Sequence, residues 1–188
     1  AFAYGDDKGG LIGFSDFALA KMEEERDDDD VSYASGTLSH APRADIAFYY
    51  ANFAFALSFA ATAATIMSGA VAERMNFKAY IPLTILTVSV IYPIVAHWIW
   101  SKQGWASAFG EENDRLFGVG VLDFAGSLVV HVTGGTAALV TCWSLGARSD
   151  RFGVGGKIND LPMQSPVFQM FGTFLMWFGW YGFNCGSV

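Results

Sequence analysis

The sequence predicts an all-α, polytopic membrane protein, and two observations support this fold class. Charged residues make up only 15% of the 188 residues, against roughly 25% in soluble proteins. The charges are also confined to a few segments, which leaves long apolar runs between them. Because a transmembrane helix needs about 20 apolar residues, we expect four spans; a large soluble protein with buried helices is the disfavoured alternative. The runs without Asp, Glu, Lys or Arg are Ile46–Ala72, Ala79–Ala96, Phe124–Ala147 and Leu161–Val188.

The residues before the first span divide into two parts. Residues 1–4 are apolar and look like the end of an earlier membrane helix, whereas residues 5–44 are polar and form an acidic outer loop. Residues 23–30 are all acidic except for Arg26. Such a run indicates a solvated loop; the alternative is that its negative field concentrates cations at a pore mouth.

The first two predicted membrane helices cover residues 45–72 and 79–100. The first is rich in alanine, which permits close helix approach in a membrane. In the second, Pro82 is expected in the first turn, where proline is tolerated, and Pro93 is expected to kink the far end. Trp100 ends this helix at the membrane–water boundary, where tryptophans collect.

The other two predicted membrane helices cover residues 122–146 and 165–188. The third helix carries Asp123 at its start and His131 eight residues later, about 12 Å deeper at ~1.5 Å per residue. An ionisable side chain inside a membrane usually faces a pathway or a partner. His131 is therefore a candidate pore residue, and a structural histidine bonded to the backbone is the alternative. Asp123 is interpreted first as a helix cap or dipole partner.

The connections between the helices indicate how the chain crosses the membrane. The links at residues 73–78 and 147–164 carry more Lys and Arg than acid, whereas the loop at residues 101–121 leans acidic. The positive-inside rule places the two basic links in the cytoplasm. The outer half then contains Phe59, Trp100, Asp123 and the end of the fourth helix.

These outer residues form a set of aromatic rings with one hydroxyl, above a buried histidine. Aromatic faces attract a small cation by ~0.5–2 kcal/mol, and a hydroxyl oxygen accepts a hydrogen bond from an N–H group. A neutral imidazole, with a reference pKa near ~6.5, suits proton handling. The set favours a small N–H cation, although an interfacial aromatic belt is the alternative for each tryptophan. Its members are Phe55, Phe59, Trp100, Phe183 and Ser187, with His131 below them.

Several other functions are disfavoured by the composition. The sequence shows no nucleophile–base pair and no metal-binding cluster, so we expect neither an enzyme nor a bound metal or cofactor. A net charge of −7 without a basic stripe argues against nucleic acid as a partner. Cys142 and Cys185 are interpreted as packing residues, and His40 and His97 as surface residues.

Three segments carry a resemblance to a known family: Ser68–Arg74, Asp123–His131 and Trp177–Ser187. In order and spacing they resemble signature segments of the ammonium transporter family (Amt/Mep/Rh), most closely its Amt branch. The resemblance covers almost the whole chain. It implies a fold of about eleven membrane helices with an inverted repeat, of which this chain holds the end of the second helix to the sixth. It also implies ammonium or ammonia as substrate, a homotrimer in lipid and a plasma-membrane location.

The same resemblance implies roles for the outer residues. Phe59 and Phe183 correspond to the stacked phenylalanines that gate the pore. Trp100 and Ser187 correspond to the outer recruitment site, with Phe55 beside it and Phe59 as its floor.

Two further roles follow from the resemblance. Asp123 corresponds to an acid that supports the outer site through structure and electrostatics rather than as a ligand. His131 corresponds to the first of two pore histidines, of which the second belongs to a later half that these residues do not include. We therefore expect a piece of a longer transporter; an ammonium sensor of the same fold and a truncated membrane subunit used for packing are the alternatives.

Overall fold

The computed structural model describes residues 43–187, which are helical and contain no β-strand. The all-α fold class is thereby confirmed. The predicted acidic loop at residues 5–44, with His40, lies outside the described residues, except that its last two residues begin the first described helix. The main helices are α2 (Arg43–Val71), α3 (Phe77–Leu86), α4 (Tyr92–Trp100), α5 (Thr133–Leu145) and α6 (Pro166–Cys185).

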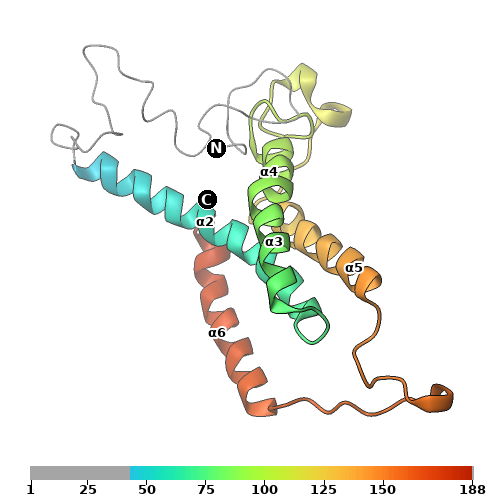
Figure 1. The fold of residues 1–188 in the computed structure, drawn as a ribbon. Helices are drawn as coiled ribbons and strands as arrows, with labels where there is room; N and C mark the ends of the chain where they lie inside the picture. The colour runs from blue at the N-terminus through green and yellow to red at the C-terminus, as the bar shows by residue number, and fades with distance from the viewer. Residues whose placement is uncertain (1–42, 188) are drawn as a thin grey trace.

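Two of these helices are extended by π-helical turns. Thr87–Ile91 joins α3 to α4, and Ser127–Val132 leads into α5. In Figure 1, α3 and α4 form one continuous column, and α2 and α5 pass beside it. The connections contain three short 3₁₀ turns, at Glu112–Asp114, Leu116–Gly118 and Val154–Gly156.

Three of the described helices are long and apolar enough to cross a membrane: Phe53–Val71, Phe77–Trp100 and Ser127–Leu145. They correspond to the first three predicted spans. The fourth predicted span forms α6, which is 20 residues long but is not one of the three. Gln169 and Asn184, together with its glycines, tryptophans and tyrosine, lower its hydropathy relative to the alanine- and valine-rich helices.

The prolines of the second span behave differently from the prediction. Asn76 caps α3 by accepting a hydrogen bond from the Lys78 amide at 2.9 Å, so the helix begins at Phe77. Pro82 therefore lies inside the helix, and its predicted place in the first turn is wrong. Near Pro93 the helix widens into the π turn that precedes it. A proline ring clashes with the carbonyl four residues earlier and offers no N–H to it, and the wider turn accommodates both effects.

α2 and α5 pack closely because small residues face each other. A Cβ atom on Gly134 of α5 would lie 2.7 Å from the Ala63 carbonyl oxygen of α2. Ala63 is fully buried at this crossing, and Met67, one turn further along α2, is fully buried with its sulfur 4.0 Å from the Thr87 hydroxyl. The crossing supports the prediction that the alanine-rich first span allows close helix approach.

Both basic links lie at one end of the bundle. Arg148 of the later link forms an ion pair with Glu73 of the earlier one, and Arg74 Nη1 donates to the Gly146 carbonyl at 3.1 Å. Two membrane crossings separate the two links, so both must lie on the same side of the membrane, as the charge pattern predicts.

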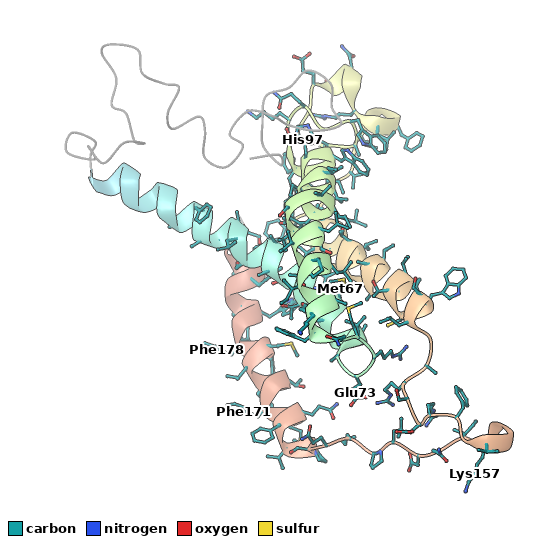
Figure 2. The ribbon with its side chains drawn as sticks, in the orientation of Figure 1. Met67, Glu73, His97, Lys157, Phe171 and Phe178 are labelled. Carbon is teal, nitrogen blue, oxygen red and sulfur yellow. The ribbon has the colours of Figure 1, made fainter. Side chains whose placement is uncertain are left out.

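α6 contacts the bundle mainly near its C-terminal end. Figure 1 shows it descending from α2 and diverging from the other helices. Phe171 and Phe178 project away from the bundle in Figure 2 and are 59% and 79% exposed. The described residues therefore leave most of α6 uncovered.

The loop after α4 folds back over the helix end and buries His97, so the expectation that His97 lies at the surface is wrong. The Ala106 amide donates to the Trp98 carbonyl at 3.1 Å. At Gly104 a Cβ atom would lie 2.2 Å from the His97 carbonyl oxygen, so only glycine permits this approach. The His97 side chain is fully buried as a result.

Candidate functional site

Four aromatic rings from three helices meet around Phe59, a buried residue of α2. Its ring stacks on Phe183 of α6 at a centroid distance of 4.2 Å and an interplanar angle of 19°. Trp100 of α4 meets Phe59 edge-on at 5.8 Å, and Phe55 lies one turn away on α2 at 4.7 Å. The structure thus brings together residues that are far apart in the sequence; Phe55 and Phe183 are separated by 128 positions.

Trp100 is held in place by a hydrogen bond through its indole. Nε1 donates to the backbone carbonyl of Asp123 at 2.6 Å. Because an indole has a single donor and no acceptor, this bond sets the orientation of the ring. The edge-on contact with Phe59 places the two rings at 70° to each other.

Asp123 is almost fully buried, and its carboxylate caps the helical segment that follows. Oδ1 accepts hydrogen bonds from the amides of Gly126 and Ser127 at 3.0 and 2.8 Å. Oδ2 accepts from Leu128 and Val129 at 2.9 and 2.8 Å. These donors are the otherwise unpaired N–H groups of a helix start, where a negative charge is stabilised. The interpretation of Asp123 as a helix cap is confirmed by these bonds.

His131 lies in the π turn, half-buried below the stacked phenylalanines. Its Nδ1 is 3.0 Å from the Gly126 carbonyl oxygen. The imidazole centroid lies 6.0 Å from the Phe183 ring and 5.5 Å from the Trp180 ring. His131 is thus both bonded to the backbone and in contact with the aromatic residues. A structural histidine and a candidate pore residue, the two interpretations of the sequence, are therefore compatible.

Ser187 follows the C-terminal end of α6. Its hydroxyl donates to the Phe183 carbonyl at 2.7 Å, which leaves the oxygen lone pairs as acceptors. The preceding residue, Gly186, lies against Phe55: a Cβ atom there would be 3.3 Å from the Phe55 ring. Ser187 is therefore positioned by the same helix end that carries Phe183, on the side of Phe55.

Trp180 is a member of this cluster that the sequence reasoning did not single out. Its ring stacks on Phe183 at 5.2 Å and 18° and faces His131. The signal was available in the helical spacing, because residues three apart share one face. Trp180 extends the aromatic stack from Phe59 down to the imidazole.

The side chains of this cluster are mostly aromatic, and few polar groups lie among them. The described residues contain no group of three or more His, Cys, Asp or Glu that could hold a metal ion. The cluster offers aromatic rings, a hydroxyl acceptor and an imidazole. Such a set can hold a weakly hydrated cation through its N–H groups and ring faces, and it disfavours an ion that must keep its water shell.

Comparisons with known proteins identify the family of the chain. The model of the Ammonium Transporter Family matches residues 1–188. Two relatives from Arabidopsis thaliana, ammonium transporter 1 member 1 and putative ammonium transporter 1 member 5, are each 43% identical over 187 residues. Ammonium transporter 1 member 1 from Oryza sativa subsp. japonica is 42% identical over 187 residues. Each match covers all of this chain and 33% of the relative, so the chain spans about a third of their length. The chain belongs to the ammonium transporter family, whose members are transport proteins rather than enzymes.

Proposed function

We propose that the protein to which these residues belong transports ammonium or ammonia across a membrane, and that this chain supplies the outer site, the gate and one pore histidine. The observation that carries the proposal is the continuous aromatic stack of Phe59, Phe183 and Trp180, which runs from Trp100 to His131.

Recruitment of ammonium is assigned to the residues above the stack. Trp100 and Phe55 provide ring faces, Phe59 closes the floor, and the Ser187 oxygen accepts an N–H hydrogen bond. A cation over such rings is stabilised by ~0.5–2 kcal/mol, and the N–H bond to the hydroxyl adds ~0.5–1.5 kcal/mol net. The hydrogen bond favours ammonium over an alkali ion of the same charge, because an alkali ion has no N–H group to donate.

The gate is assigned to Phe59 and Phe183. Rings stacked at a centroid distance of 4.2 Å leave no room for a molecule between them, so passage requires one ring to rotate. An apolar constriction of this kind blocks hydrated ions more than a small neutral molecule. Ammonium therefore releases its proton to solvent water at the outer site, and the neutral ammonia crosses the rings and moves along His131.

The wider setting follows from the family. We propose a homotrimer with one pore per subunit in the plasma membrane, with a second pore histidine supplied by residues outside this chain. Asp123 supports the outer site by holding Trp100 and by adding negative potential.

The test is uptake of labelled methylammonium by yeast cells without their own ammonium transporters, expressing the full-length gene product. We expect Trp100→Leu to raise the concentration for half-maximal uptake by roughly tenfold, as a loss of ~1.4 kcal/mol of cation binding predicts. Trp143→Leu is the matched control, because Trp143 is 85% exposed on α5. No uptake by the wild-type protein would refute the proposed function; an unchanged concentration dependence in Trp100→Leu would refute the recruitment role.

A further inference from the structure

We propose that the loop between α4 and the π turn before α5 anchors the protein in the membrane surface on the side opposite the basic links, with the Phe117 ring inserted between the lipid headgroups and the acyl chains. Val119 and Leu122 flank this ring in the sequence. These three side chains are called the apolar tip of the loop below. The partner of the apolar tip is the lipid surface itself.

The apolar tip is exposed, although residues beside it in the sequence are packed. Phe117 is 93% exposed, and Val119 and Leu122 are each 70% exposed. Leu116 and Val121, in contrast, pack against the buried core of the bundle. The loop thus directs one set of apolar side chains into the protein and a second set out of it, and within residues 43–187 the second set stays largely uncovered.

The backbone at Phe117 is strained. Its φ of 54° and ψ of 24° lie in the left-handed region, which a bulky residue seldom adopts. Glycine would adopt this conformation without strain, and a polar residue would suit an exposed turn in water. The aromatic ring therefore gains nothing from its own turn, and a strained backbone of this kind points to a contact outside the fold.

The loop begins and ends where the helices leave the membrane. The span Phe77–Trp100 contains 24 residues, about 36 Å at ~1.5 Å per residue, which exceeds the ~30 Å thickness of the hydrocarbon core. The end of this span therefore lies at the membrane boundary, and the bond from Trp100 to the Asp123 carbonyl holds the end of the loop at the same level. In Figure 1 the two 3₁₀ turns of the loop lie beside the upper end of α4.

The turn that carries Phe117 has paired backbone amides. The amides of residues 118–121 all donate to carbonyls of the same loop, at 2.7–3.3 Å. Arg115 Nε also donates to the Gly110 carbonyl at 3.1 Å, which closes the base of the turn. Because unpaired N–H groups are costly next to hydrocarbon, this pairing allows the turn to enter the boundary region without loss of hydrogen bonds.

A lipid surface fits the apolar tip better than a protein partner does. A stable protein interface uses about 20–30 residues on each side, whereas the tip consists of three apolar side chains and follows the exposed Glu111 and Glu112. Aromatic side chains collect at the membrane–water boundary, where lipid adapts its shape to a small apolar projection. The two glutamates remain in water while the ring is inserted.

The experiment is electron paramagnetic resonance of a nitroxide attached at Phe117→Cys, in the full-length protein with its native cysteines replaced by serine, in phosphatidylcholine bilayers. Val119→Cys is the second labelled variant. Glu112→Cys is the matched control, because Glu112 is exposed in the same loop. We expect the nitroxides at 117 and 119 to relax more with oxygen, which concentrates in lipid, than with a water-soluble nickel chelate, and the order to reverse at 112.

Two outcomes would overturn the inference. Free access of the nickel chelate to position 117 would place the tip in water. A nitroxide at 117 that neither reagent reaches would place the tip under protein, either a second copy or a part of the protein beyond these residues. The measurement needs no transport activity, so its result is independent of the proposed function.

Discussion

Replacement of Asp123 is expected to destabilise the protein more than replacement of any exposed acid, because its buried carboxylate accepts hydrogen bonds from four backbone N–H groups. A hydrogen bond to a charged group contributes ~1.5–3 kcal/mol net. Four such bonds sum to at least ~6 kcal/mol, and water entering at the freed helix start recovers part of this. We expect Asp123→Ala to lower the free energy of unfolding by about 4 kcal/mol.

Asp123→Asn removes the negative charge of the side chain and keeps its size and shape. The amide oxygen can still accept from one pair of backbone N–H groups, but the amide nitrogen would point at the other pair and can only donate. Two bonds are lost and two donors face each other. We therefore expect Asp123→Asn to be destabilised by about 2–4 kcal/mol, although its side chain has nearly the same volume, because unsatisfied buried donors cost ~1–3 kcal/mol each.

The assay is reversible unfolding of the purified full-length protein in mixed micelles, followed by tryptophan fluorescence. Asp160→Ala and Asp160→Asn are the controls, because Asp160 is exposed in the link before α6 and should change stability by less than ~0.5 kcal/mol. If Asp123→Asn unfolds at the same denaturant fraction as the wild type, the argument that the carboxylate carries this segment is wrong.

Two further predictions concern α5 and the π turn that leads into it. His131→Ala should lower methylammonium uptake by roughly 100-fold, because it removes the proton-handling imidazole of the proposed pore; unchanged uptake would argue against a pore role for His131. Gly134→Val should destabilise the protein by about 2–3 kcal/mol, because its Cβ would lie 2.7 Å from the Ala63 carbonyl and overpacking costs ~1–3 kcal/mol; wild-type stability in the same unfolding assay would show that α2 and α5 separate without cost.

The positions of the helices could be predicted from the sequence because membrane spans are set by composition and length, which are local properties. The uncharged run Ala79–Ala96 lies inside the helical stretch Phe77–Trp100, and its start was displaced only by the Asn76 cap. The two π turns could not be predicted, since a hydrogen bond shifted from four to five residues leaves the apolar pattern unchanged. The burial of His97 was also out of reach, because it depends on a loop that returns over the helix end and on Gly104 beneath it.

For the site, the sequence predicted the participants better than their connections. The spacing of Phe55 and Phe59 indicates one helix face, and the family resemblance pairs Phe59 with Phe183; the structure stacks these rings. The bond from Trp100 to the Asp123 backbone has no sequence signature, because any residue at position 123 has a carbonyl. Trp180 was overlooked although helical spacing places it beside Phe183.

The hydrogen bonds of Asp123 also explain why its carboxylate would not bind a cation directly. A carboxylate has about four lone-pair positions, and here each oxygen already accepts two backbone N–H groups. A cation could bind the carboxylate directly only by displacing one of these bonds and loosening the segment that holds both Trp100 and His131. In the proposed outer site, the negative charge would therefore act through space and attract every cation of the same charge, and discrimination would fall to the rings and the Ser187 oxygen. A direct carboxylate ligand would favour small alkali ions, which gain most from a full negative charge; aromatic faces with one hydroxyl acceptor favour an ion that brings its own N–H donors.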